Sequence, residues 1–163
     1  MTREASTVAL GPGEGATIEN PVGGAIVFKA TAAETGGTMT VFETIVAPGE
    51  GPPLHVHANE DEAVYVPKAI STSVSGRTCA ARRPAFLFIP RGTPHTFQNV
   101  GGDAARFLVI FAPLGMERFF ERMAADGSRA GDVATFAATG REVGLEVVGP
   151  PLAAVEAPDP RRT

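Results

Sequence analysis

The chain has 163 residues, the length of one domain, and 44% of them are hydrophobic, which is enough for one core. A formal net charge of −4 lacks the basic footprint of a nucleic-acid-binding domain, so we expect no nucleic-acid partner. The single cysteine excludes an internal disulfide. Residues 1–10 lack the apolar core of a signal peptide, and no apolar run reaches the roughly 18 residues of a membrane span. We therefore expect a reduced, cytoplasmic protein that does not bind membranes.

Short β-prone runs follow an N-terminal arm. The runs, rich in Val, Ile, Phe and Thr, cover residues 25–31, 38–46, 62–66, 71–75, 86–89, 95–99 and 106–112. Segments rich in Gly and Pro lie between them and predict turns, as at residues 48–53 and 91–94. Many short strands separated by turns predict an all-β sandwich or barrel, and no βαβ alternation indicates a parallel sheet.

The pattern changes after Pro113. Apolar residues recur at i, i+3, i+4 and i+7, at Met116, Phe119, Phe120 and Met123. This spacing predicts an amphipathic helix that ends near Gly127. A second helix is expected over residues 132–139, with Asp132 as N-cap and Gly140 as its stop. Residues 143–148 fit either a closing strand or an extended tail. The chain then divides into an N-terminal arm (1–19), a barrel (20–113), C-terminal helices with a closing segment (114–151), and a loose tail (152–163).

All histidines of the chain belong to one pattern, formed by His55, His57 and His95. Residues two apart in a strand point to the same face, so His55 and His57 would present two imidazoles side by side. Glu62 follows after four further residues, where a tight turn would start an antiparallel partner strand and bring its carboxylate near the pair. Three imidazoles and a carboxylate suit one divalent metal and do not distinguish Fe, Mn, Co, Ni and Zn. Alternatively, each histidine is a satisfied polar or surface residue of a strand.

Two motifs carry a family resemblance. They are Gly49-x5-His55-x-His57-x4-Glu62 and Pro90-x-Gly92-x2-His95-x3-Asn99. These motifs resemble the two signatures of the cupin superfamily, and the residues that flank them resemble those of small monocupins of the quercetin-dioxygenase-like group. The resemblance runs from about residue 20 to 151. It implies a single conical antiparallel β-barrel (the double-stranded β-helix) with a C-terminal amphipathic helix, and a homodimer. It also implies the metal ligands, position for position: His55, His57, Glu62 and His95.

The chain departs from these signatures at two turns. Ala69 stands where the first signature closes with Gly, and Pro84 and Ala85 replace the Gly and Asp that open the second. Such positions often need φ > 0, which Ala and Pro avoid. We therefore expect altered turns at residues 67–71 and 82–85, away from the ligands.

The resemblance implies three functions. The first is a dioxygenase that acts on a hydroxylated aromatic or a polyketide- or flavonol-like molecule, with Glu62 taking a substrate proton before O₂ attacks. The second is a non-oxidative cyclase, isomerase or decarboxylase of natural-product biosynthesis, with Glu43 as a second carboxylate if it faces inward. The third is a non-catalytic small-molecule-binding module. Family sensors often carry a DNA-binding domain, and the first 20 residues are too short for a helix-turn-helix.

A bound aromatic substrate requires an apolar cavity. Val64 shares a strand face with Glu62, and Phe97 and Asn99 share one with His95, so these are the first candidates for its wall. Further candidates, whose strand register is open, are Met39, Phe42, Glu43, Phe86, Phe88 and Phe107. Plain core packing is the alternative for each Phe. The helix near residues 115–126 would cover one end of the barrel, as a plug or as a lid. Arg91 would contact an anionic substrate or lie exposed in its turn.

Overall fold

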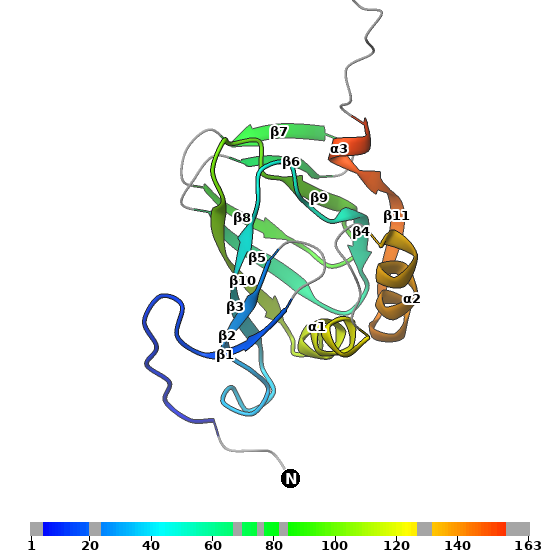
Figure 1. Cartoon of the computed structure of the whole chain (residues 1–163). Coiled ribbons are helices and arrows are strands. Elements are labelled where there is room, and N and C mark those ends of the chain that lie inside the picture. Colours follow the sequence, from blue (N-terminus) through cyan, green and yellow to red (C-terminus); the bar gives the residue numbers. More distant parts are fainter. Residues whose placement is uncertain are drawn as a thin grey trace, which may run out of the picture.

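Two antiparallel β-sheets face each other and form the body of the protein (Figure 1). The computed structural model describes residues 5–19, 24–66, 70–74, 77–81, 85–126 and 132–155. The larger sheet has the order β1 (Ala16–Ile18), β2 (Ile26–Ala30), β3 (Thr40–Val46), β10 (Ala105–Ala112), β5 (Asp61–Val66), β8 (Ala85–Ile89). The smaller has the order β11 (Leu145–Pro151), β4 (Pro53–His57), β9 (His95–Gln98), β6 (Ile70–Val74), β7 (Arg77–Ala81).

This architecture confirms the predicted antiparallel all-β fold with a C-terminal amphipathic helix. Each β-prone run of the sequence coincides with a strand, and the structure adds β1, β4 and β7, which were not among those runs. A strand at His55 and His57 was assumed only from the spacing of the two histidines. Among the described strands, the hydrogen-bonded ladders remain two separate sheets and do not close into one ring. The two sheets are therefore held together by the packing of side chains between them, and strand pairing stabilises each sheet by itself.

The core lies between the two sheets and follows the alternation of the strands. In β3 and β10, every second residue is buried, including Phe42, Val46, Phe107 and Val109. Phe97 of the opposite sheet packs against Phe107, with ring centroids 4.9 Å apart. Burying one such side chain contributes about 1.5–3 kcal/mol, so the central strands of the larger sheet supply much of the apolar stabilisation.

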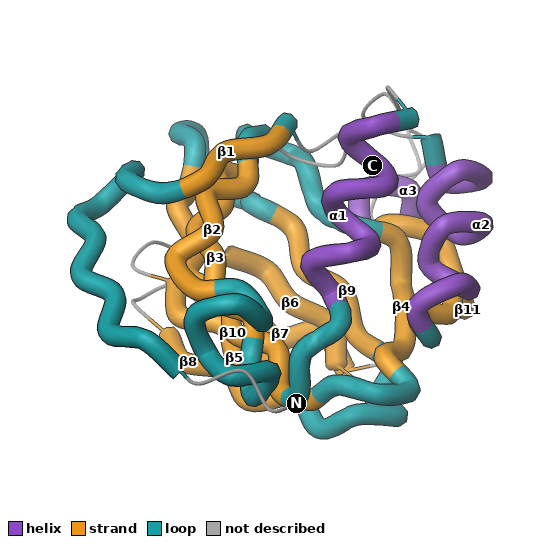
Figure 2. The backbone as a smooth tube through the Cα atoms, turned by 90° about the horizontal axis from the view of Figure 1, so that it is seen from below, coloured by secondary structure: helices purple, strands orange, loops and turns teal. Residues whose placement is uncertain are grey.

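Two helices lie next to each other at one end of the sheets (Figures 1 and 2). α1 (Met116–Ala125) buries Met116, Phe119 and Met123, as its apolar period predicts. α2 (Val133–Val143) begins at the predicted N-cap Asp132, whose side chain accepts a hydrogen bond from the Thr135 backbone N at 3.0 Å. A third, single-turn helix is α3 (Leu152–Val155). None of the helices in the described ranges has the length and apolar content needed to cross a bilayer.

The prediction that Gly140 ends the second helix was wrong. α2 continues to Val143 and ends at Gly144, which adopts the left-handed conformation with φ 86°. A glycine is needed at residue 140 because a Cβ there would lie 2.7 Å from Leu145 Cδ2 and 3.0 Å from the Leu145 carbonyl oxygen. Gly140 thus permits α2 to pack closely on β11, which the local sequence pattern could not reveal.

The ends of the chain join the sheets. β1, from the predicted arm, pairs with β2, and β11, from the predicted closing segment, pairs with β4 and resolves residues 145–151 as a strand. The division into arm, barrel, closing segment and tail stays a prediction. Ala69 and Pro84, and residues 156–163 of the expected tail, lie outside the described residues, whereas Ala85 pairs with Val66 as the first residue of β8.

Replacing Gly140 by Ala should lower stability. Ala ordinarily stabilises a helix interior by about 1 kcal/mol relative to Gly, but the crowding against Leu145 should reverse the sign and cost about 1–3 kcal/mol. Urea unfolding measures the change. The control is Ala138→Gly on the exposed side of α2, where only the loss of helix propensity, about 1 kcal/mol, is expected. A stabilised Gly140→Ala variant would contradict the close packing.

Candidate metal centre

Two neighbouring strands bring the three histidines together. His55 and His57 lie on the inward face of β4, and His95 begins β9, where it is the register partner of His55. All three side chains are buried. The predicted side-by-side arrangement within the His-x-His pair is present, with ring centroids 4.9 Å apart, and the centroid of His95 lies 4.4 Å from that of His55. One sheet therefore contributes all the imidazoles.

Glu62 comes from the opposite sheet. The expectation that its strand pairs with the His-x-His strand was wrong, because β5 pairs with β8 and β10, and β4 pairs with β9 and β11. Residues 58–60 cross from one sheet to the other, so the Glu62 carboxylate reaches the histidines across the interior. The approach is made between the two sheets, whose described strands do not pair with each other.

The turn before His95 is tied to the start of β5. Arg91 donates from its backbone N to Asp61 Oδ1 at 2.9 Å and from Nη2 to Asp61 Oδ2 at 2.9 Å. These hydrogen bonds from Arg91 hold the pKa of the Asp61 carboxyl at about 2, below its usual range. The Gly92 N donates to the His57 carbonyl at 2.8 Å. Since Asp61 directly precedes Glu62, this ion pair positions the carboxylate relative to the histidines. Arg91 is thus an exposed turn residue whose charge is paired with Asp61.

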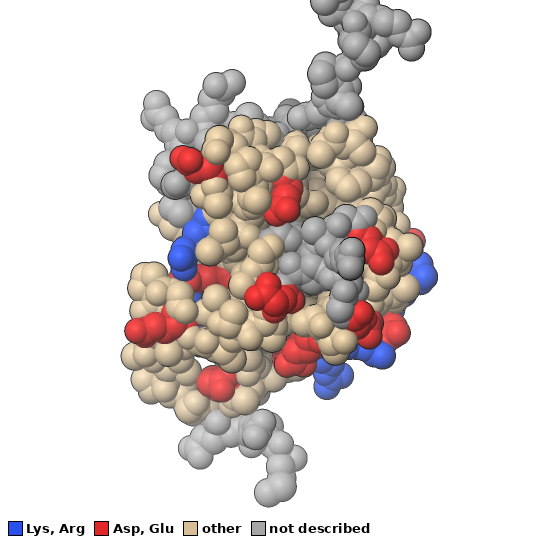
Figure 3. All heavy atoms as spheres, in the orientation of Figure 1, with Lys and Arg blue, Asp and Glu red and all other residues tan. Residues whose placement is uncertain are grey.

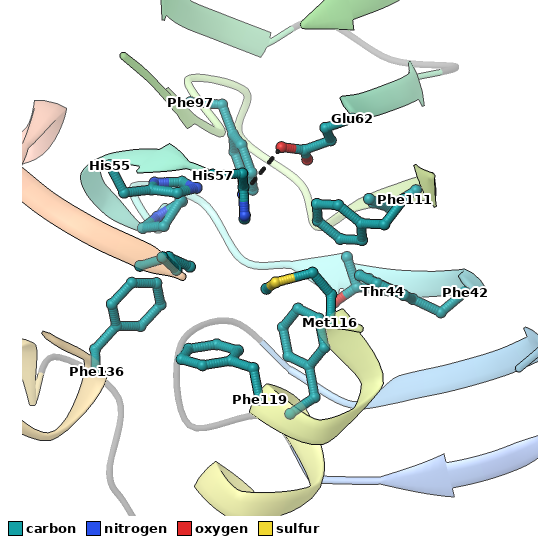
Figure 4. Close-up of a pocket in the computed structure, with 14 residues that line it drawn as sticks. Phe42, Thr44, His55, His57, Glu62, Phe97, Phe111, Met116, Phe119 and Phe136 are labelled. Carbon is teal, nitrogen blue, oxygen red and sulfur yellow. Dashed lines mark ion pairs between the residues drawn. The ribbon is translucent and has the colours of Figure 1, made fainter. Parts of the chain in front are cut away.

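The four side chains bring their candidate ligand atoms to one centre. Figure 4 shows three of them, His55, His57 and Glu62. The candidate ligand atoms of all four lie within 4.8 Å of one another. Glu62 Oε2 is 2.8 Å from His95 Nε2 and 3.5 Å from His57 Nε2. Ligands at about 2.1 Å from one ion lie about 3 Å apart when they are neighbours. The spacing therefore fits a single divalent ion with little movement of the side chains.

The hydrogen bonds of the histidines leave lone pairs for such an ion. Nδ1 of His55 lies 2.7 Å from the Pro53 carbonyl, and Nδ1 of His95 lies 2.9 Å from the Thr93 carbonyl. A carbonyl oxygen only accepts, so both Nδ1 atoms carry a proton, which leaves the two Nε2 atoms as the candidate ligands. Nε2 of His95 contacts Glu62 Oε2 at 2.8 Å, and a metal ion between them would replace this contact. Neither ring nitrogen of His57 has a hydrogen-bond partner among the described residues, although both are buried. A buried imidazole without a partner is costly, and coordination would satisfy it.

The environment shifts the pKa values of His55 and Glu62 toward their metal-binding forms. Burial, with the neighbouring His95 and His57, lowers the pKa of His55 to about 3, so its imidazole is neutral. Burial alone would raise the pKa of Glu62, but the close contacts and charges of His57 and His95 outweigh it and hold the pKa well below its usual range. For His95, burial alone would lower the pKa, and the contact with Glu62 raises it. The centre therefore contains an ionised carboxylate and at least one neutral imidazole.

A small apolar cavity of about 70 Å³ adjoins these donors. Beyond His55, His57 and Glu62, its wall consists of Phe42, Thr44, Pro52, Phe97, Val109, Phe111, Met116, Phe119, Phe120, Phe136 and Leu145. Residues of α1 and α2 close the side opposite the donors (Figure 4). Ligand pockets usually measure about 300–1,000 Å³. A substrate larger than a few heavy atoms therefore requires the side chains from these helices to move.

The predicted wall residues fall into two groups. Phe97 and Phe42 line the cavity. Val64 and Phe107 are buried in the hydrophobic core and do not line it. Asn99 is also buried, but its Nδ2 donates to the Val46 carbonyl at 2.9 Å and to the Asp103 carbonyl at 2.8 Å. Asn99 therefore ties together the loops beside the barrel instead of facing the cavity.

The remaining candidates face outward, so the prediction that they line the cavity was wrong. Met39 lies just before β3 and is exposed, and Phe86 and Phe88 are exposed on the outer face of β8. Glu43 is an outward residue of β3 that pairs with Lys29 Nζ at 3.3 Å and Arg106 Nη1 at 2.7 Å. Arg106 and Lys29, with the Gly13 backbone N, lower its pKa against the opposing effect of partial burial. It cannot serve as a second inward carboxylate.

Sequence reasoning missed most of the wall. It did not assign Thr44, Phe111, Phe119 or Phe136 to a cavity, although Phe119 was placed on the apolar face of its helix. Phe111 is the register partner of Glu62 on β10, and Phe119 of α1 meets Phe136 of α2 edge to face, with ring centroids 4.9 Å apart. Alternation with Phe42 could have indicated Thr44, since the two residues share one face of β3. No comparable pattern in the local sequence indicated that Phe119 and Phe136 line a cavity.

The fold and the buried donor set define a β-barrel protein with a candidate His₃Glu metal centre. Residues 42–111 match the family model of the cupin domain. Residues 42–111, less than half of the chain, are therefore similar to a cupin domain, and the fold agrees with this likeness. Membership of the quercetin-dioxygenase-like group stays a prediction.

The chain is also similar to individual proteins. Protein SchB of Streptomyces halstedii is 33% identical over 91 residues, which cover 55% of this chain and 64% of SchB. The match thus spans less than two thirds of that relative. An RmlC-like cupin from Shewanella frigidimarina superposes with a TM-score of 0.58 at 12% identity, covering 71% of this chain and 97% of the other. A predicted oxalate decarboxylase from Thermotoga maritima gives 0.52 at 21% identity, covering 61% and 91%. At these identities, the solved structures show the fold alone.

The charged surface offers no competing site on the face drawn in Figure 3. Acidic side chains are scattered over it, and the described basic side chains form no continuous patch there. The expectation of no nucleic-acid partner stays a prediction that agrees with this distribution.

Removing one donor should abolish metal binding. The protein is expected to bind one Co²⁺ per chain, and His95→Ala should lose more than about 100-fold in affinity, beyond the usual effect of an outer-shell change. Cobalt titration followed by visible absorption measures this, and elemental analysis checks the stoichiometry. The control is Gln98→Ala on the same strand, whose side chain donates instead to the Gly49 carbonyl. Equal binding by both variants would refute the centre.

Removing the Arg91 side chain should weaken the centre without destroying it. Arg91→Ala frees Asp61, so Glu62 loses part of its positioning and metal affinity should fall up to about tenfold. The control is Arg141→Ala on the exposed surface of α2. Competition with a chelator measures both affinities. An unchanged affinity in Arg91→Ala would show that the ion pair does not position the carboxylate.

Proposed function

We propose that this protein is a metal-dependent dioxygenase that acts on a hydroxylated aromatic molecule of the polyketide or flavonol type. The observation that carries the proposal is the placement of four convergent donors at the end of a cavity lined largely by phenylalanines. A planar aromatic ring packs well against such a wall. A hydroxyl group on that ring would then be the part of the substrate that reaches the donors.

The chain supplies binding and proton transfer. When bound, the metal acts as Lewis acid and template and lowers the pKa of the substrate hydroxyl. Glu62 is ionised and accepts that proton. The phenylalanines exclude water from the deprotonated ring. O₂ then adds to the electron-rich ring carbon, and both oxygen atoms remain in the product, so no external reductant is consumed.

The composition of the wall favours oxidative over non-oxidative chemistry. A cyclase, isomerase or decarboxylase usually needs a second acid or base to move a proton at another atom of the substrate. Among the described residues that line the cavity, the titratable groups are the donors themselves, and Thr44 is the other polar side chain. The role in natural-product biosynthesis stays a prediction from the resemblance.

The proposal predicts oxygen consumption that depends on Glu62. Metal-loaded protein should consume O₂ with at least one member of a panel of flavonols and smaller polyphenols, and ¹⁸O₂ should place both labelled atoms in the product. Glu62→Gln should lower the rate per bound metal about 10²- to 10⁴-fold, because the amide cannot accept the proton. Metal content is measured for each preparation, so that lost metal is not mistaken for a lost base.

The matched control is Glu43→Gln, which alters a carboxylate on the outer face of the larger sheet. Its rate should equal that of the unchanged protein. Turnover of the same substrate under strict anaerobiosis would exclude the dioxygenase and support the non-oxidative alternative. Binding of the substrate without turnover in air, by metal-loaded protein, would support a binding module.

A further inference from the structure

A second cleft lies on the opposite face of α1 from the metal centre. The face of α1 that contains Met116 and Phe119 lines the cavity at the metal centre, whereas Arg118 and Arg122 line the second cleft. Residues 59–60, the start of α1 and the end of α2 form its walls, and its volume is about 600 Å³. Ligand pockets usually measure about 300–1,000 Å³, so this outer cleft, as we call it, has room for a small molecule.

Glu60 is a buried acid of the outer cleft with an unused hydrogen-bond acceptor. The residue is only 2% exposed, and its Oε2 has no hydrogen-bond partner among the described residues. Oε1 lies beside Gly115, where a Cβ would come within 2.6 Å of it, so the glycine leaves room for the carboxyl at the wall of the cleft. The last side-chain torsion of a glutamate is broad, so a small rotation presents the free oxygen to the cleft. A donor from a ligand would then satisfy it.

Arg118 supplies the opposite charge of the outer cleft. It is exposed, and its guanidinium makes no ion pair or hydrogen bond with another described residue. Arg122, one turn further along α1, is paired with Glu142 of α2. Residues four apart are neighbours on a helix, and like charges at that spacing repel each other. A carboxylate bound by the Arg118 guanidinium would relieve this repulsion through charge-assisted hydrogen bonds.

The distribution of charge favours a ligand that carries both signs. The titratable groups of the described lining are three acids and two bases, Glu60, Glu121, Glu142, Arg118 and Arg122. A simple anion would approach the carboxylates, and a simple cation would approach the guanidinium groups. No ion pair joins Glu60 to Arg118 in the described part of the chain, so the two groups leave a gap that a molecule with an ammonium and a carboxylate can bridge.

We propose that the outer cleft binds a free amino acid with an apolar side chain. Its ammonium donates to the Glu60 carboxyl, and its carboxylate accepts from the Arg118 guanidinium. Leu114 and Val143 are the apolar side chains of the described lining, and they are half-buried, so they offer a surface for the side chain of the ligand. The bound molecule would lie across α1 and residues 59–60 and would leave the cavity at the metal centre open.

The test compares L-leucine with two analogues that each lack one charged group. 4-Methylpentanoate has no ammonium, and 3-methylbutylamine has no carboxylate. Isothermal titration calorimetry measures all three on the whole protein, with and without bound metal. We expect L-leucine to bind with a Kd of about 1 mM or lower, and each analogue to bind at least tenfold more weakly because it leaves one charged group of the cleft without a partner. The affinity should not depend on the metal.

Two substitutions examine the two ends of the ligand. Arg118→Ala removes the exposed guanidinium, and Glu60→Gln replaces the carboxyl by an amide of the same shape. Each should weaken L-leucine binding at least tenfold. The matched control is Arg141→Ala, an exposed arginine of α2 that does not line the outer cleft, and it should leave the affinity unchanged. Circular dichroism, the midpoint of thermal unfolding and a cobalt titration show that each variant keeps its fold and its metal centre.

Four results would overturn the proposal. The first is no binding of L-leucine up to about 10 mM, ten times the expected Kd. The second is equal binding by the two variants and the unchanged protein, which places the ligand elsewhere. Binding that requires the metal would indicate chelation at the metal centre, and equal binding of 4-methylpentanoate would indicate a plain anion site. None of these readouts depends on turnover, so failure here is distinct from failure of the proposed dioxygenase.

Discussion

The contact between the Glu62 carboxylate and the imidazoles of His57 and His95 is the constraint around which the interior is arranged. It joins the two sheets at a buried point, where a carboxylate without partners would be strongly disfavoured. Removing one member of such a buried set typically costs about 3–5 kcal/mol because the remaining charge is left uncompensated. The donors therefore hold the sheets in register with each other as well as offering lone pairs to an ion.

The surroundings of this contact are built to keep it in place. The carbonyls of Pro53 and Thr93 accept hydrogen bonds from His55 and His95 and so orient these two imidazoles. The ion pair between Arg91 and Asp61 joins the turn before His95 to the start of β5. On the inner side lie only apolar side chains and one threonine besides the donors, among the described lining residues. The low local dielectric of this apolar wall strengthens every electrostatic interaction at the centre. Because the wall itself has few polar side chains, the donors are the main groups that could move a proton.

The same strands serve two surfaces through their alternation. On β5, Glu62 and Val64 point into the interior, while Ala63 and Tyr65 point out to the apolar surface beside Phe86 and Phe88. A one-residue slip of β5 would exchange the two sets and would remove the carboxylate from the histidines. Pairing with β8 and β10 on both sides prevents that slip, so the register that builds the metal centre also builds the outer apolar face.

Local sequence was sufficient for everything that depends on neighbours along the chain. The strand runs, the shared face of His55 and His57, the apolar side of α1 and the Asp132 cap all follow from periods of two or 3.6 residues and from capping chemistry. Tertiary structure alone decided that Glu62 reaches the histidines from the opposite sheet, that Gly140 lies inside a helix against Leu145, and that Phe42 faces inward while Phe86 faces solvent. These choices depend on which distant strands pair and in which register, and that pairing is set by the packing of the whole core, which no short stretch of residues contains.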